Sequence, residues 1–181
     1  MRVVVLAGGT GRRLGYPGQK CCVPIAGRPF LHWKLDQLTE QGATEIDMLV
    51  SHAWREVEET VAPYPSVRLL EDPGEGPWNA VRWYAHHHAS TRAFIVTYGD
   101  TLLDCEFPDT SPSMVVTRHT GPYLPSNLLG EYIDAGLYRV SRDHPLSTMW
   151  RFVETSVRPW TINTPEQYEE TSAYLDRHRE P

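Results

Sequence analysis

A short apolar strand that runs directly into a glycine- and arginine-rich loop is the feature that most constrains the fold of this chain. Residues 2–6 are mostly β-branched and apolar, which is typical of a buried strand. The loop from Ala7 to about Pro24 contains glycines, which let the main chain approach a ligand closely, and several basic side chains. The pattern predicts an anion-binding loop at the end of a buried first strand.

Strand and helix patterns alternate after this loop. A helix is expected from Pro29 to Gly42, and a capping box at 164–167 predicts a terminal helix that ends near Arg177. The alternation predicts an α/β fold with a mainly parallel sheet, formed by residues 1–181 as a single domain, with ligands at the carboxyl ends of the strands. The other expected elements are strands at 46–50, 67–70, 94–96, 114–117 and 132–140, helices at 54–62 and from Pro77 onward, and a loop over the site at 120–130.

The composition narrows the classes of partner and the location. The 181 residues carry a net charge of −6, which argues against a nucleic-acid polymer as partner because binding consecutive phosphates needs a basic surface. No apolar run is long enough to cross a bilayer or to form a signal peptide. Three cysteines form no disulfide framework or metal-ligand spacing. We therefore expect a cytoplasmic protein without a membrane partner, and the sequence leaves the oligomeric state open, a homo-oligomer included.

Three basic residues of the loop, Arg12, Arg13 and Lys20, can neutralise a triphosphate that an acidic protein would otherwise repel. Two other phosphate motifs do not fit. A dinucleotide-binding fingerprint needs glycine where Leu14 stands, and a P-loop needs Ser or Thr after its Gly-Lys pair. The remaining alternative is a solvated surface loop, which the density of glycine and arginine directly after a first strand disfavours.

The same segment resembles the signature of the sugar-phosphate nucleotidyltransferases, LAGG-x-G-T-R-L followed by a proline–lysine pair and a further proline. Arg12 stands where that family has threonine, and Gln19 where it has the proline of the pair. The resemblance implies a Rossmann-like three-layer αβα sandwich in which the loop binds a nucleotide. The matching positions are Leu6, Ala7, Gly8, Gly9, Gly11, Arg13, Leu14, Lys20 and Pro24.

Later segments resemble the same family in the same order, so the likeness covers nearly the whole chain. Residues 71–73 and 76–80 look like a weakened form of its nucleobase loop, and residues 94–101 like the strand that ends at its metal-binding aspartate. Residues 133–138 look like its acceptor-side strand and residues 160–168 like its closing segment. The resemblance implies that Lys20 contacts the reacting phosphates, Arg13 the leaving pyrophosphate, and that Asp100 binds Mg²⁺. The expected nucleotide-binding residues are Leu6, Ala7, Gly8, Gly9, Gly11, Arg12, Glu71 and Gly76, and the expected acceptor-binding residues are Glu131, Asp134 and Gly136.

Two departures from the family concern the metal and the acceptor. Thr161 aligns with the second metal-binding aspartate of most sugar nucleotidyltransferases, and a neutral hydroxyl is a poor replacement. Either Asp100 binds Mg²⁺ with phosphates and waters, or the protein binds nucleotide without turnover, with Asp104 and Asp134 as further candidates to compensate. The family's Glu-Lys pair before the acceptor strand is absent, so we expect a small or unusual acceptor pocket.

These observations predict an Mg²⁺-dependent nucleotidyltransferase that couples a nucleoside triphosphate to a sugar 1-phosphate and releases pyrophosphate. Because a phosphomonoester is anionic near pH 7, it can attack the α-phosphorus without a general base, and catalysis rests on positioning and charge neutralisation. Three alternatives stay open: a molybdenum-cofactor-type guanylyltransferase, whose closing segment also reads Asn-Thr-Pro, an enzyme with another small phosphorylated acceptor, and a non-catalytic nucleotide-binding domain. The sequence leaves the nucleobase undetermined.

Overall fold

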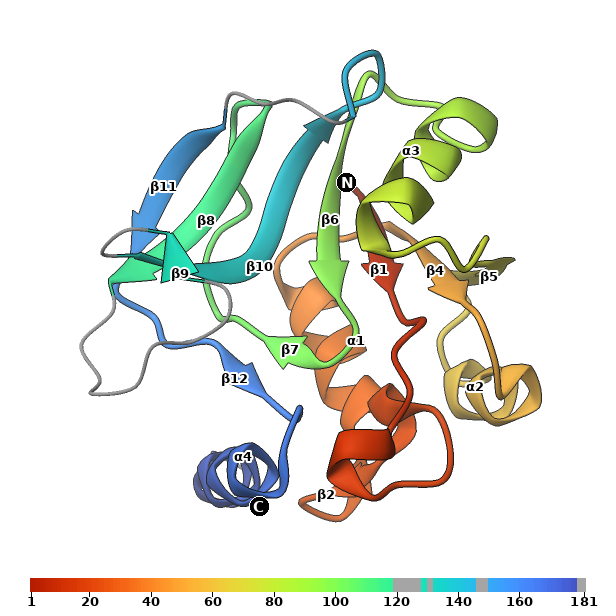
Figure 1. Cartoon of the computed structure of the whole chain (residues 1–181), viewed down its shortest axis with the longest axis vertical. Coiled ribbons are helices and arrows are strands. Elements are labelled where there is room, and N and C mark those ends of the chain that lie inside the picture. The colour runs from red at the N-terminus through yellow and green to blue at the C-terminus, as the bar shows by residue number, and fades with distance from the viewer. Residues whose placement is uncertain (119–127, 130–131, 146–149, 179–181) are drawn as a thin grey trace.

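The computed structural model of the chain describes residues 1–118, 128–129, 132–145 and 150–178 (Figure 1). Their centre is an eight-stranded sheet in the order β11-β8-β10-β6-β1-β4-β5, with β9 paired to β10. All the strands expected from the sequence are present, and their ends differ from expectation by at most two residues. The strands of this sheet are Arg2–Leu6 (β1), Glu45–Val50 (β4), Val67–Glu71 (β5), Ala93–Tyr98 (β6), Ser113–Arg118 (β8), Leu128–Leu129 (β9), Tyr132–Ser141 (β10) and Arg151–Thr155 (β11).

The four strands nearest the Gly-rich loop are parallel. Val4 of β1 lies opposite Asp47 of β4 and Val96 of β6, and β5 continues the parallel set beside β4. β10 runs antiparallel to both β6 and β8, whereas β11 is parallel to β8. The carboxyl ends of β1, β4, β5 and β6 therefore meet at one end of the sheet, the lower end in Figure 1. The expected mainly parallel sheet is confirmed.

Helices cover both faces of this sheet. α1 and α2 pack on one face and α3 on the other. Successive side chains of β1 point to opposite faces of the sheet, and both faces are apolar. Val3 and Val5 are buried with α1 and α2, and Val4 is buried with α3. Full burial of such a side chain contributes about 1.5–3 kcal/mol. The expected three-layer αβα sandwich is confirmed. The helices are Phe30–Glu40 (α1), Trp54–Val61 (α2), Pro77–His87 (α3) and Pro165–Arg177 (α4).

A third, smaller core joins the C-terminal segment to the same end of the sheet. β7 pairs with β12 so that Thr161 lies opposite Thr101, and Leu175 of α4 is buried in this core. The expected helix start is confirmed, because the Thr164 hydroxyl accepts a hydrogen bond from the main-chain N–H of Gln167 (3.3 Å). The short elements are Arg12–Leu14 (η1) and Lys20–Cys22 (η2), which are 3-10 helices, and the strands Pro24–Ile25 (β2), Arg28–Pro29 (β3), Thr101–Leu102 (β7) and Trp160–Thr161 (β12).

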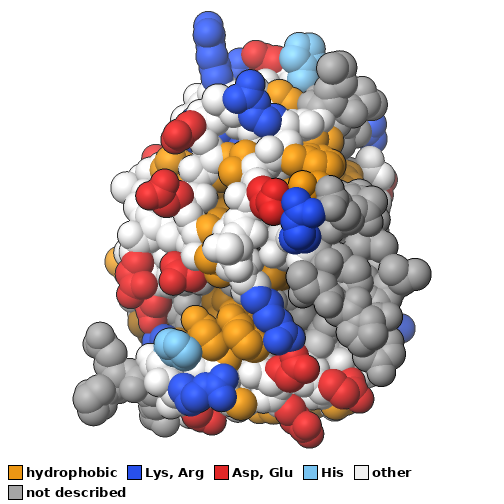
Figure 2. Space-filling model, turned by 90° about the vertical axis from the view of Figure 1, so that its left-hand side faces the viewer, with side chains coloured by type: hydrophobic (Ala, Val, Ile, Leu, Met, Phe, Trp, Pro, Cys, Tyr) orange, Lys and Arg blue, Asp and Glu red, His pale blue; other side chains and the backbone are white. Residues whose placement is uncertain are grey.

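Some expectations from the sequence fall on positions that the structure does not describe. Of the loop expected at 120–130, only 128–129 belong to the described residues, and Glu131 lies outside them. Within the described part of the chain, no helix is long and apolar enough to cross a bilayer. On the β11 side of the molecule, acidic and basic side chains are interspersed among the described residues (Figure 2).

Candidate functional site

Two cavities open where the parallel strands end. The first, of about 360 Å³, lies between the Gly-rich loop and the segment after β5, and the second, of about 1280 Å³, lies beside β10 and the C-terminal segment. Lys20, Tyr98 and Asp100 line both cavities. The residues expected to contact phosphates and metal therefore lie where ligands in the two cavities would meet. Of the other expected site residues, Leu6, Ala7, Gly8, Gly9 and Gly76 line the first cavity, and Arg13, Asp134 and Gly136 line the second.

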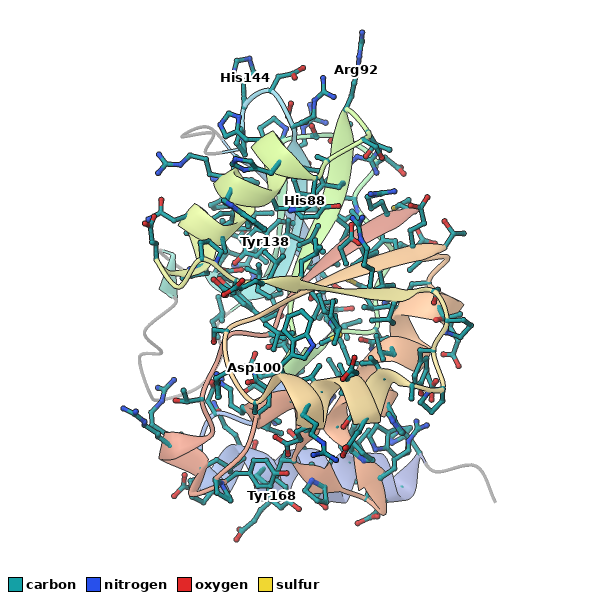
Figure 3. The ribbon with its side chains drawn as sticks, turned by 90° about the vertical axis from the view of Figure 1, so that its right-hand side faces the viewer. His88, Arg92, Asp100, Tyr138, His144 and Tyr168 are labelled. Carbon is teal, nitrogen blue, oxygen red and sulfur yellow. The ribbon has the colours of Figure 1, made fainter. Side chains whose placement is uncertain are left out.

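Lys20 joins three segments that are distant in the sequence. Its Nζ forms an ion pair with Asp100 and donates a hydrogen bond to Oδ1 of Asn163 (2.7 Å). The Thr101 hydroxyl donates to the other oxygen of the Asp100 carboxylate (3.1 Å). In Figure 3, Asp100 lies between the sheet and helix α4, far from Arg92 and His144 at the opposite end of the molecule. The Gly-rich loop, the end of β6 and the closing segment thus converge on one ammonium group.

The close approach of Gly8 to Asp72 shapes the first cavity. A β-carbon at Gly8 would lie 2.5 Å from Oδ2 of Asp72, so no larger residue fits without displacing that carboxylate. The other oxygen of Asp72 accepts a hydrogen bond from the main-chain N–H of Gly74 (2.8 Å). The expected contact residue Glu71, in contrast, is exposed and does not line the cavity. Its neighbour Asp72 lines the cavity instead, because successive residues at a strand end point in opposite directions, and a nucleotide-binding role for either residue stays a prediction.

Two further expectations for the loop need adjustment. Arg12 is exposed and lines neither cavity, whereas Arg13 lines the second. Gly11 also lies outside both cavities, and its role is steric, since a β-carbon there would lie 2.5 Å from the main-chain oxygen of Tyr16. The loop therefore presents its N-terminal glycines and Lys20 to a ligand, while Gly11 allows its turn.

Gln19, which stands where the resembled family has proline, is almost fully buried. Its Nε2 donates to the main-chain oxygens of both Ala7 and Gly9, the latter at 3.2 Å. Because these two carbonyls lie at the start of the loop, one side chain ties the beginning of the loop to its end. The sequence contains a signal for this role, since a polar side chain directly before the expected phosphate-binding lysine is unusual for the family pattern.

On the acceptor side, the half-buried Asp134 and the buried Tyr138 form a polar pair. The Tyr138 hydroxyl donates to the Asp134 carboxylate, which also accepts from the main-chain N–H of Gly136 (2.9 Å). Burial raises the pKa of Asp134 and, together with the nearby negative charge, the pKa of Tyr138. The second cavity, which Asp134 lines, is the larger of the two, and the small or unusual acceptor pocket expected from the sequence stays a prediction.

Lys34 is a buried cation that the sequence reading overlooked. It lies on the apolar face of α1 with 2% of its surface exposed, and its Nζ donates to the Thr97 hydroxyl (2.9 Å). Burial lowers the pKa of Lys34 to about 7, against the opposing influence of Asp100 and Cys105. A lysine at helical spacing among Leu31, Leu35 and Leu38 is the signal that would have found it.

The donor groups at the junction of the cavities suit Mg²⁺, a hard cation that prefers oxygen ligands. Asp100 lines both cavities, and Thr161 lines the second. Asp104, offered as a compensating carboxylate, is exposed and lines neither cavity, while Asp134 lines the second. Among the described residues no group of three acidic, histidine or cysteine side chains surrounds a single point. Mg²⁺ often binds one or two carboxylates together with substrate phosphates, so this sparse set fits the ion.

A parallel sheet with a glycine-rich loop and a lysine–aspartate pair at its carboxyl end defines the class of α/β proteins that bind phosphate-containing ligands at that end. Comparison with known protein families identifies the family within this class. Residues 3–109, more than half of the chain, match the model of the MobA-like NTP transferase domain. The chain belongs to this family, and the resemblance to nucleotidyltransferases inferred from its motifs is confirmed.

A curated relative matches part of the chain, and solved structures share its fold. The chain is 42% identical over 59 residues to the low-salt glycan biosynthesis nucleotidyltransferase Agl11 of Haloferax volcanii, a match that covers 31% of this chain and 16% of that protein. The matched region is thus a small part of this curated relative. The crystal structure of HddC from Yersinia pseudotuberculosis has a similar fold, with a TM-score of 0.78 at 18% identity over 96% of this chain and 99% of that one. The inositol-1-phosphate CTP transferase of T. maritima gives a TM-score of 0.72 at 15% identity over 94% of each chain.

Proposed function

We propose that this protein is a nucleotidyltransferase that joins a nucleoside triphosphate to a sugar 1-phosphate and releases pyrophosphate. The observation that carries the proposal is the Lys20–Asp100 pair at the junction of the two cavities. A nucleotide in the first cavity and an acceptor in the second would bring their phosphates together at this pair. Family membership, and the activities in the names of Agl11 and the T. maritima transferase, support the same reaction class.

The chemistry follows from the charges at this junction. The acceptor phosphate attacks the α-phosphorus, a new phosphorus–oxygen bond forms, and the bond to pyrophosphate breaks with the electron pair going to that leaving group. Lys20 holds the reacting phosphates in line, and Arg13 neutralises charge on pyrophosphate as it leaves. Asp100, with the Thr161 hydroxyl, would hold Mg²⁺. When bound, this ion supplies further neutralisation of phosphate charge. The attacking group is already anionic near pH 7, so the chain needs no general base.

We also propose that the nucleotide is a guanine nucleotide. The position of Asp72 favours this base. Its carboxylate lines the first cavity beside Gly8. Guanine carries neighbouring N–H donors on one edge, which a carboxylate can accept together, whereas uracil and thymine present mostly acceptors there. A solved complex of HddC contains GMP-PN. The molybdenum-cofactor-type guanylyltransferase therefore stays the main alternative within the same reaction class, and it differs from the sugar enzyme in its acceptor.

The test is pyrophosphate release with each common nucleoside triphosphate, Mg²⁺ and a panel of sugar 1-phosphates and other phosphorylated acceptors. We expect acceptor-dependent release with GTP, reduced by about 10²–10³-fold in Asp100→Asn and Lys20→Ala. Asp104→Asn, an exposed position in the same segment, serves as the control and should retain the activity of the unchanged protein. Nucleotide binding without release for any acceptor would instead indicate a non-catalytic domain, and a requirement for a pterin acceptor would indicate the guanylyltransferase.

The proposal also includes Mg²⁺ as the metal ion and the cytoplasm as the location. A thermal-shift titration of the protein with Mg²⁺ and a non-hydrolysable nucleotide should show stabilisation that Asp100→Asn loses. We also propose a cytoplasmic location, supported by the three cysteines, all of which are unpaired in the structure. Fractionation of cells that produce the protein would test that location directly.

A further inference from the structure

Glu56 of helix α2 contacts the far side of the Gly-rich loop. One oxygen of its carboxylate accepts a hydrogen bond from the Tyr16 hydroxyl (2.6 Å), and the other accepts from the main-chain N–H of Gln19 (2.7 Å). The loop passes so close that a β-carbon at Gly18 would lie 2.4 Å from this carboxylate. Glu56 thus holds the residues directly before Lys20 from two sides.

Helix α2 does not use this glutamate in the usual way. Glu56 is the third residue of the helix, where a glutamate commonly bonds back to the N-cap of its own helix. Here the N-cap residue is Ala53, which has a positive φ of 49° and no side chain able to cap. The helix start therefore lacks its ordinary stabilisation, while its glutamate is directed to the loop. Departures from local rules of this kind are typical of functional sites.

The segment between β4 and α2 contacts the loop at a second point. The Ser51 hydroxyl donates a hydrogen bond to the main-chain oxygen of Gly8 (2.9 Å). Ser51 and Glu56 together bracket the loop at its beginning and its end. Within the loop itself, the main-chain N–H of Lys20 donates a hydrogen bond to the main-chain oxygen of Gly9 (3.4 Å). The position of Lys20 therefore depends on contacts at both ends of the loop.

We propose that Glu56 is a positioning residue that fixes the Gly-rich loop, and with it Lys20, in the geometry that receives the phosphates of the nucleotide. This inference rests on the nucleotide-binding part of the proposed function. Charge alone gives the opposite expectation, because a carboxylate beside a phosphate-binding loop repels the ligand. Both of its oxygens are engaged by the loop, so its contribution comes through geometry.

The variant Glu56→Gln separates these two effects. Glutamine keeps the size of the side chain and removes the negative charge. Its amide oxygen can still accept from the main-chain N–H of Gln19 and its NH2 group can donate to the Tyr16 hydroxyl oxygen, but both contacts lose the strength that a charged acceptor gives them. If positioning dominates, the dissociation constant for GTP, measured calorimetrically without acceptor, rises by about tenfold or more. Tyr16→Phe, which removes one partner, should give a smaller rise, and KM for GTP should increase more than kcat falls. Glu59→Gln is the matched control, because Glu59 is exposed on the same helix and pairs with Arg55.

Amide hydrogen exchange of the ligand-free protein provides the second measurement. We expect faster exchange in residues 10–19 of Glu56→Gln and Tyr16→Phe, with the sheet unaffected. An unchanged or tighter GTP dissociation constant in Glu56→Gln, or unchanged loop exchange, would overturn the inference even if the unchanged protein is fully active. Conversely, weaker GTP binding and faster loop exchange would uphold it even if no acceptor ever released pyrophosphate, an outcome that would refute only the transfer reaction.

Discussion

Replacing Lys34 with methionine should make the protein more stable at neutral pH. The lysine ammonium is buried in α1 with the Thr97 hydroxyl as its hydrogen-bond partner, and burial lowers its pKa from 10.5 to about 7. In the unfolded chain the same group remains protonated up to about pH 10.5. Folding at neutral pH therefore requires the lysine either to lose its proton or to bury a charge, and both oppose folding.

The magnitude follows from the two pKa values. Each pH unit between them is worth about 1.4 kcal/mol, so the protonatable lysine opposes folding by about 4 kcal/mol at pH 7 and by about 1 kcal/mol at pH 10. Between these pH values the unfolded chain binds more protons, so this group makes the unchanged protein more stable as the pH rises. Methionine removes the penalty but leaves the buried Thr97 hydroxyl unpaired, at a cost of about 1 kcal/mol. The net gain of Lys34→Met should be about 3 kcal/mol at pH 7 and near zero at pH 10.

The assay is equilibrium unfolding in urea at several pH values between 6.5 and 10, with the variant compared with the unchanged protein at each pH. Leu38→Met, a volume-conserving change on the same buried helix face, is the control and should show a difference that does not vary with pH. Taking differences removes contributions from cysteine and tyrosine groups that titrate in this range. A stability difference for Lys34→Met that stays constant with pH, or a variant less stable at pH 7, would refute the argument.

Three further substitutions test the site. Thr161→Asp places a second carboxylate beside Asp100, through the pairing of β7 with β12, and should lower the Mg²⁺ concentration for half-maximal activity about tenfold, as a metal titration would measure. Gly8→Ala should weaken nucleotide binding about tenfold in calorimetry, because its β-carbon displaces the Asp72 carboxylate, and unchanged affinity would contradict that steric role. Asp134→Asn should become more stable relative to the unchanged protein as the pH rises above the ordinary aspartate range, because burial raises the pKa of this carboxyl in the folded state. The free energy of unfolding of both proteins, measured from acidic to neutral pH, tests this. A difference between them that does not vary with pH would contradict it.

The strand and helix positions could be predicted because their signals are local. The continuous apolar run of β1, buried at Val3, Val4 and Val5, and the helical spacing in α1 depend on residues a few positions apart, and both are confirmed. The first glycines of the loop, Lys20 and Asp100 were found in the same way, since they follow directly after β1 and β6. The roles assigned to these residues, the single domain and the oligomeric state stay predictions.

The errors and omissions share a different physical cause. Asp72 lines the first cavity and Glu71 does not, because the direction of a side chain at a strand end depends on the register of the sheet, and a displacement of one residue reverses it. Arg12 was expected to bind phosphate on charge alone, yet the turn of the loop leaves it exposed outside both cavities. The size of the second cavity likewise arises from packing between β10 and the C-terminal segment, which no local pattern encodes.

The sequence by itself determined the order of strands and helices, the glycine- and arginine-rich character of the first loop, and the family of the chain. Tertiary structure alone decided which groups meet: Asn163 reaches Lys20 across 143 positions, Glu56 reaches Gln19 across 37, and Lys34 reaches Thr97 across 63. The physical reason is that hydrophobic periodicity acts within a single element, whereas these hydrogen bonds form only after the order of the strands has brought distant segments to the same end of the sheet.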